Sequence, residues 1–174
     1  MKKVKQLPKT IKLFNFAKKE VNLHGECRIS NMPRVSEITK NDDDSVKVDL
    51  SFHLENEKTP CVKGIINLKV VLDCQKCLDD LEIVLDIPFK LAFIEFEDQA
   101  IGLDNSYEIY LIGEVQNLET IDLITDEILL SIPMAPSHDY DCGLKTDKGN
   151  IVEEVREHPF DVLKNIKIAD LGKE

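Results

Sequence analysis

The sequence contains no tryptophan, and aromatic residues make up only 6% of its 174 residues. The core must therefore be built mainly from leucine, isoleucine and valine. No apolar run approaches the roughly 20 residues that cross a bilayer as a helix. The basic N-terminus also lacks the continuous apolar stretch and the small-residue cleavage site of a secretory signal. These absences predict a cytoplasmic protein that does not interact with membranes.

The sequence motifs of common enzymes are missing as well. It has no glycine-rich phosphate-binding loop, no G-x-S-x-G, no H-E-x-x-H and no G-x-G-x-x-G. Carboxylates are abundant but scattered over charged stretches, and no pair of them stands out for acid–base catalysis. We therefore expect a non-catalytic protein.

Positive charge is concentrated at the start of an otherwise acidic chain. Residues 1–20 contain seven lysines and one glutamate, a net charge of +6. The other 154 residues contain 15 basic and 32 acidic residues, a net charge of −17. A broad RNA-binding face needs basic side chains against the phosphates, so direct contact with RNA falls to this N-terminal arm. The candidate contacts for RNA or another partner are Lys2, Lys3, Lys5, Lys9 and Lys12.

This arm has a simpler interpretation, as a solvated terminus without a partner. The acidic remainder of the chain suits a partner that is itself a basic protein, because opposite charge favours their association. Ribosomal proteins are such partners. Both interpretations of the arm stay open at this point.

Apolar residues at alternate positions predict several strands. The predicted strands cover residues 20–29, 45–54, 63–73, 81–96 and 107–112. Pro88 lies inside one of them and predicts an edge position or a bulge, because proline has no N–H for a sheet ladder. The histidine at position 53 falls on the polar side of its strand, which predicts a solvated side chain.

Helical spacing predicts short helices between and after these strands. One covers residues 11–18 with Thr10 as its N-cap. Another covers residues 121–132, with Thr120 as its N-cap, and ends before Pro133. A last short helix is predicted to begin near position 158. The apolar stripe of the second helix comprises Ile121, Ile124, Ile128 and Ile132.

These elements predict a single α+β domain that spans residues 1–174. Its sheet is an antiparallel meander or a partly closed barrel of about five to seven strands, with two or three short helices packed on it. The basic arm covers residues 1–20, and an exposed loop covers about 143–157.

Cys74 and Cys77 lie between two long predicted strands, so the residues between them form the turn of a hairpin. A tight turn places two thiolates on one side, as two vertices of a zinc tetrahedron require. His138 and Cys142 follow a stiff Pro-Met-Ala-Pro connector and supply two further ligand types. Together the four residues form a Cys3His set, which predicts a closed structural zinc site between the hairpin and the C-terminal half.

Each part of this set has an alternative. The two cysteines could be buried thiols without a metal. His138 could cap its loop or form a hydrogen bond within it, in place of binding a metal. His24 and Cys27 form a competing second pair with the same two-residue spacing. Cys27 and the remaining cysteine, Cys61, otherwise resemble ordinary small apolar residues. Residues 42–44, three aspartates in a row, lack the glycine and terminal glutamate of a calcium loop and predict a turn.

Two sequence blocks around these residues resemble the YceD family, whose members are called large ribosomal RNA subunit accumulation proteins. The first is LDCQKCL at residues 72–78, followed by the long alternating strand. The second is residues 121–139 with Cys142 after it. The two ends, at residues 3–8 and 158–167, are also similar, so the resemblance runs nearly the whole length of the chain.

The resemblance implies a bacterial, cytoplasmic protein that is needed for normal accumulation of 23S rRNA. The partners of such a protein would be ribosomal proteins or other assembly and processing factors. The resemblance implies no catalytic mechanism. By position, the family's cysteine pair falls on Cys74 and Cys77, and its His/Cys segment falls on His138 and Cys142. Two other functions stay open: a thiol–disulfide oxidoreductase that uses Cys74 and Cys77, and a metal-dependent RNA hydrolase.

Overall fold

A computed structural model of the chain describes residues 7–113 and 117–143. In chain order, its elements are β1 (Thr10–Lys12), α1 (Leu13–Lys18), β2 (Asn22–Arg28), η1 (Ile29–Asn31), α2 (Pro33–Ser36), β3 (Ser45–Glu55), β4 (Thr59–Asp73), β5 (Asp80–Ile94), η2 (Glu97–Ala100), β6 (Glu108–Leu111), β7 (Asn117–Glu119) and α3 (Thr120–Ser131). The helix predicted near position 158 and nearly all of the loop predicted at 143–157 lie outside the described residues.

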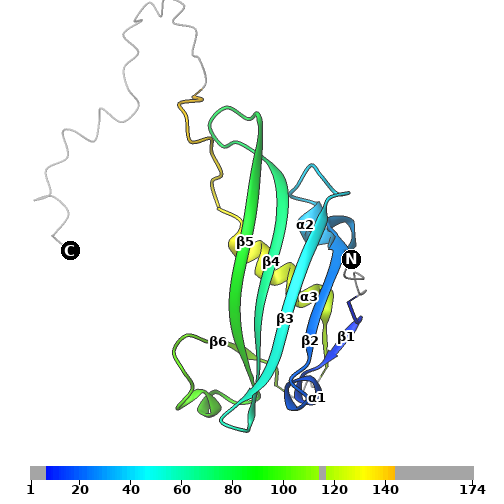
Figure 1. Ribbon diagram of the computed structural model, residues 1–174. Coiled ribbons are helices and arrows are strands. Elements are labelled where there is room, and N and C mark those ends of the chain that lie inside the picture. Colours follow the sequence, from blue (N-terminus) through cyan, green and yellow to red (C-terminus); the bar gives the residue numbers. More distant parts are fainter. Residues whose placement is uncertain (1–6, 114–116, 144–174) are drawn as a thin grey trace, which may run out of the picture. The chain divides into compact units, whose positions relative to one another are not determined.

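The main sheet has five strands in the order β2-β3-β4-β5-β6 (Figure 1). Its first four strands form an antiparallel meander, as the alternation predicted. One face of the sheet is apolar throughout, because every second residue points to it. The buried side chains of β3 and β4 on this face are Val46, Val48, Leu50, Phe52, Val62, Ile66, Leu68, Val70 and Leu72. The sheet is open, and the predicted α+β class is confirmed.

The fifth strand departs from the predicted meander, because β6 pairs with β5 in parallel. Its four residues pair with Leu91–Ile94, the last four residues of β5. Parallel neighbours need a crossover connection, and residues 95–107 with η2 supply it. This connection is tied to the sheet at Tyr107, whose hydroxyl oxygen lies 2.8 Å from His53 Nε2 on β3.

The first predicted helix begins two residues later than expected. Residues 10–12 form β1, which pairs with β7, and the helix begins at Leu13. Thr10 is therefore no N-cap. Pairing with a distant strand overrides the local preference of this short stretch, as long-range contacts often do.

Helix α3 has nearly the predicted limits but not the predicted cap. Thr120 is the first residue of the helix, and its hydroxyl donates a hydrogen bond of 2.5 Å to the backbone carbonyl of Pro8. The helix crosses the apolar face of the sheet (Figure 1) and buries Leu123, Ile124 and Ile128 there. Leu123 was not part of the predicted stripe, whereas Ile121 at the helix start is only half-buried.

Pro88 confirms the predicted edge position. It pairs with Ile65 on β4, but β6 begins to cover the other side of β5 only at Leu91. Among the described residues, β5 from Asp80 to Lys90 is thus an edge of the sheet. This edge begins at the cysteine-containing turn.

Candidate metal centre

The turn that holds the first two cysteines joins β4 to β5, as predicted. The backbone N–H of Cys74 donates to the carbonyl of Asp79 at 2.9 Å, and the N–H of Leu78 donates to the carbonyl of Cys74 at 2.9 Å. Leu78 closes the turn in the left-handed region, with a φ of 62°. These two bonds fold the turn tightly and bring the cysteine side chains to one side of it.

The segment after α3 carries the other two residues to this turn. Helix α3 ends at Ser131 because Pro133 disfavours helical backbone in the residue before it. The chain then extends to Pro136, whose carbonyl accepts a hydrogen bond of 2.8 Å from the backbone N–H of Gln75. This contact fixes residues 133–142 beside the turn and places His138 and Cys142 there.

The four predicted ligand residues meet at this point. Their ligand atoms all lie within 4.8 Å of one another. Cys74 Sγ is 3.5 Å from Cys142 Sγ, and Cys77 Sγ is 3.5 Å from His138 Nδ1. A tetrahedral zinc ion with Zn–S bonds of about 2.3 Å and a Zn–N bond of about 2.0 Å needs separations of about 3.8 Å between sulfurs and about 3.5 Å between sulfur and nitrogen. The side chains present therefore fit a zinc ion with little movement.

His138 is oriented by its second ring nitrogen. Its Nε2 lies 3.3 Å from the backbone carbonyl oxygen of Asp80, to which it donates when protonated there, and this leaves Nδ1 facing the sulfur atoms. Metal-binding histidines are commonly held in this way by a backbone carbonyl. The ring of Tyr140 stacks on that of His138, with their centroids 4.8 Å apart. The ring is thus fixed on two sides before any metal arrives.

The thiolate form is favoured at one cysteine. Burial alone would raise the pKa of Cys74, but hydrogen bonds from the backbone N–H groups of Cys77, Lys76 and His138 outweigh it and lower the pKa to about 5. At Cys77, the backbone N–H of Asp79 also lowers the pKa. Burial and the neighbouring cysteine sulfurs outweigh this effect and raise the pKa of Cys77 to about 11. One negative charge is thus already favoured in the cluster.

An ion-pair network braces the base of the hairpin next to the cluster. Lys40 Nζ lies 2.6 Å from a carboxylate oxygen of Asp73 and 2.6 Å from one of Asp80. These two hydrogen bonds raise the pKa of Lys40. The Lys40 backbone also donates to Val71 on β4 at 2.9 Å. The segment before β3 therefore holds both strands of the hairpin in place where the cluster begins.

The competing pair does not join this cluster. His24 contacts Asp49 across the β2–β3 ladder, while Cys27 is half-buried, and burial raises its pKa to about 11. Cys61 is fully buried, also with a pKa raised by burial to about 11. Cys27 and Cys61 are thus small core thiols, as predicted, and residues 42–44 form the predicted turn.

The prediction of a solvated His53 is wrong. Residues 95–107 fold back over this part of the sheet, and His53 is half-buried against Tyr107, with Glu55 Oε2 at 3.8 Å from its Nε2. Burial lowers the pKa of His53. Strand alternation could not predict this contact, because it depends on a connection more than 40 residues later in the chain.

The predicted contacts in the basic arm are only partly described. Lys9 and Lys12 have exposed side chains. Lys2, Lys3 and Lys5 lie outside the described residues. The Lys9 carbonyl accepts a hydrogen bond of 3.0 Å from the backbone N–H of Thr120, which fixes the backbone at the end of the arm.

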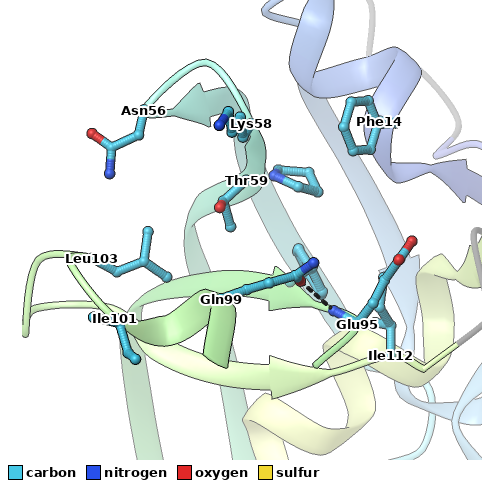
Figure 2. Close-up of a pocket in the computed structure, with 11 residues that line it drawn as sticks. Phe14, Asn56, Lys58, Thr59, Glu95, Gln99, Ile101, Leu103 and Ile112 are labelled. Carbon is cyan, nitrogen blue, oxygen red and sulfur yellow. Dashed lines mark hydrogen bonds between the residues drawn. The ribbon is translucent and has the colours of Figure 1, made fainter. Parts of the chain in front are cut away.

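A cavity of about 430 Å³ lies at the other end of the long strands (Figure 2). Figure 2 shows Leu103 and Gln99 on one side of it and Thr59 and Phe14 on the other. Its lining also includes Lys58, so it mixes apolar and polar groups. No sequence pattern predicts this cavity, because it forms between the β3–β4 turn, α1 and the crossover connection.

Residues 62–167 match the family described as Large ribosomal RNA subunit accumulation protein YceD. The match covers both halves of the cluster. The chain belongs to the YceD family. It is also 29% identical over 173 residues to the Large ribosomal RNA subunit accumulation protein YceD of Haemophilus influenzae, an alignment that covers 96% of this chain and 99% of that protein. No solved structure matches the chain significantly. No helix within the described residues is long and apolar enough to span a membrane.

Proposed function

We propose that this YceD-family protein supports accumulation of the large-subunit ribosomal RNA in the bacterial cytoplasm, as a non-catalytic factor in ribosome biogenesis. The observation that carries the proposal is the nearly end-to-end similarity to a relative of that name. The proposed partners are ribosomal proteins or other assembly factors. The net charge of −11 favours basic proteins, and any direct contact with rRNA falls to the lysines of the N-terminal arm.

We further propose that Cys74, Cys77, His138 and Cys142 hold a structural zinc ion. Three sulfurs and one imidazole nitrogen are ligands that zinc prefers. Four protein ligands complete a tetrahedral site and leave no position for a reacting water. The ion would therefore join the β4–β5 hairpin to the segment after α3 and supply no chemistry beyond this cross-link.

The surroundings of the cluster support a structural function over the two enzymatic ones. An oxidoreductase needs an accessible thiolate, usually at a helix N-terminus, whereas Cys74 is fully buried in a turn between two strands. A metal-dependent hydrolase needs an open coordination position, and here His138 and Cys142 complete the set of four.

The cellular proposal is tested by deleting the gene and measuring the ratio of 23S to 16S rRNA in growing cells. We expect this ratio to fall, and to be restored by the wild-type gene. A normal ratio in the deletion strain, together with no large-subunit precursor recovered on the tagged protein, would contradict the proposal.

The metal proposal is tested by elemental analysis of freshly purified protein. We expect one zinc ion per chain in the wild type and in Cys27→Ser, the matched control outside the cluster. The variants Cys77→Ser and Cys142→Ser should each lose it. One zinc ion per chain in Cys142→Ser would show that another residue is the fourth ligand. A wild-type protein without zinc would refute the site.

A further inference from the structure

The edge of β5 between the metal centre and β6 has backbone groups that point away from the sheet. The N–H of Cys74 donates to the carbonyl of Asp79, so the backbone groups of Asp79 point toward β4. Because this direction alternates along an antiparallel strand, the N–H and carbonyl of the next residue, Asp80, point away from β4. Two contacts confirm this alternation. The carbonyl of Asp80 faces His138, and the carbonyl of Ile94 accepts a hydrogen bond from Ile112 on the β6 side.

The alternation assigns the outward positions between these two contacts. They are the even-numbered residues Glu82, Val84, Asp86, Pro88 and Lys90. Within residues 7–113 and 117–143, none of these five has a backbone partner on this side. Pro88 is tolerated here because the N–H that it lacks would have pointed outward. A run of unpaired backbone groups of this kind is a template for one more strand.

The side chains along this edge add to the template. Ile83 and Leu85 pack against the main core but stay half-buried, since no further strand within the described part of the chain covers their outer side. Val84, on the opposite face, is 68% exposed. An added strand would bury more of all three side chains, and the burial of apolar surface stabilises such a complex.

The charge of the edge selects the partner. Asp80, Glu82 and Asp86 lie on one face of β5, which has no basic residue before Lys90. Lys40 pairs with Asp80 at 2.6 Å at the base of the hairpin, so the charge open to a partner is that of Glu82 and Asp86. Lys69 forms an exposed ion pair of 3.3 Å with Glu82, and such pairs are weak and open to exchange. Two copies of the chain that paired through this edge would bring like charges together, which disfavours self-association.

We infer that the β5 edge from Glu82 to Lys90 binds an extended, basic segment of a partner protein as an added strand. Backbone hydrogen bonds would provide the affinity, and lysine or arginine side chains beside the acidic residues would provide the selectivity. The chain's own residues 144–174 suit this edge less well, because they contain six basic and seven acidic residues. The inference rests on the proposed function only for the identity of the partner.

Hydrogen exchange of the full-length, metal-loaded protein tests this directly. The probe is a short synthetic peptide that alternates lysine with valine and threonine. We expect it to slow the exchange of the amides of Glu82, Val84 and Asp86. The amides of Ile83 and Leu85, which face β4, should exchange slowly with and without it. A matched peptide with glutamate in place of lysine should have no effect.

Val84→Pro supplies the specific variant. It removes one outward N–H but none of the bonds to β4, so the hairpin should fold. We expect it to weaken peptide binding about tenfold, the equivalent of about 1.4 kcal/mol. Val84→Thr keeps the N–H and should bind nearly as well as the wild type. Glu82→Lys should also weaken binding, whereas Glu57→Lys in the distant β3–β4 turn should not.

Three results would overturn the inference. One is that the three amides are already protected in the free protein, which would mean that the chain itself or a second copy covers the edge. Another is that peptide binding is unaffected by Val84→Pro. The third is that a single-stranded RNA, and not the peptide, protects these amides. None of these results would change the 23S rRNA ratio, so the function proposed above is tested separately.

Discussion

At the scale of single residues, Gly64 shows how closely the two long strands pack. It lies in β4 directly opposite Phe89 on β5, and the aromatic ring covers it. A Cβ atom added at Gly64 would lie 2.2 Å from Phe89 Cζ. A glycine inside a strand often marks such a close approach. The side chain at position 89 thus fills the space that a larger residue at position 64 would need.

Gly64→Ala should therefore destabilise the fold by roughly 1–3 kcal/mol, the usual cost of overpacking a core. Denaturant-induced unfolding measures this change. In a Phe89→Leu background the same substitution should cost clearly less, because the ring is gone. Equal costs in the two backgrounds would show that the clash with Phe89 is not the cause.

Glu127 is a carboxylic acid in an unfavourable place. Its side chain on α3 is only 6% exposed, and burial, with the nearby charges of Glu108 and Asp126, raises its pKa to about 7 from the ordinary value of 4.5. Between these two values the folded chain keeps a proton that the unfolded chain has released. Rising pH across this range must therefore lower the free energy of unfolding.

Glu127→Gln should remove this dependence, because glutamine resembles the protonated acid at every pH. We expect the variant to match the wild type near pH 5 and to be more stable at pH 8. Thermal unfolding at both pH values measures the difference. Glu119→Gln, an exposed position, serves as the control. A variant that loses stability equally at both pH values would contradict the assigned pKa shift.

At the scale of elements, sequence periodicity predicts the faces of the strands well. In β3 the predicted face is buried from Val46 to Phe52, because the side-chain period of two leaves only one register that hides the apolar residues. The pairing of β6 could not be predicted in this way. Its direction depends on where the connection at 95–107 is attached, which is a long-range contact.

That attachment depends on the Tyr107 hydroxyl group, which donates to Glu55 Oε2 at 3.3 Å and lies 2.8 Å from His53 Nε2. Tyr107→Phe removes the hydroxyl group and keeps the ring. We expect it to lower the free energy of unfolding by about 1 kcal/mol and to speed proteolytic cleavage within residues 97–106. Tyr140→Phe is the control, because that side chain is 65% exposed. If Tyr107→Phe is cleaved at the same rate as the wild type, packing and not the hydroxyl group attaches residues 95–107 to the sheet.

At the scale of the whole molecule, the cysteine–histidine cluster links parts of the chain that are far apart in sequence. Such a link stabilises a fold because metal binding adds its free energy to that of folding. Removal of the metal by a chelator should lower the melting temperature. A loss of even ~3 kcal/mol corresponds to roughly 6–12 °C for a chain of this size.

Calorimetry with and without chelator measures this effect. Cys77→Ser should melt at the lower temperature and respond no further to the chelator. Cys27→Ser should respond as the wild type does. A wild-type melting temperature that the chelator leaves unchanged would contradict a structural metal.

The sequence predicted which side chains meet at the cluster but not how they are held. The hairpin context of Cys74 and Cys77 and the rigid connector before His138 were enough to bring the four together. Two of the supporting contacts are made by backbone groups, namely the carbonyl groups of Pro136 and Asp80. Backbone groups are the same in every residue, so no residue type indicates them. The edge of β5 was indicated at one position, Pro88, because proline has no N–H for a further strand; its other backbone groups leave no sign in the sequence.

The separation of the cluster along the chain also sets a time order for its assembly. A chain leaves the ribosome from its N-terminus at about 5–20 residues per second, so Cys142 follows Cys77 by about 3–13 s. During that interval the hairpin presents only two of the four groups. An ion taken up at this stage would be held weakly and would exchange freely. If the proposed zinc ion is bound, its lasting capture waits for His138 and Cys142, the last two of the four ligands to be synthesised.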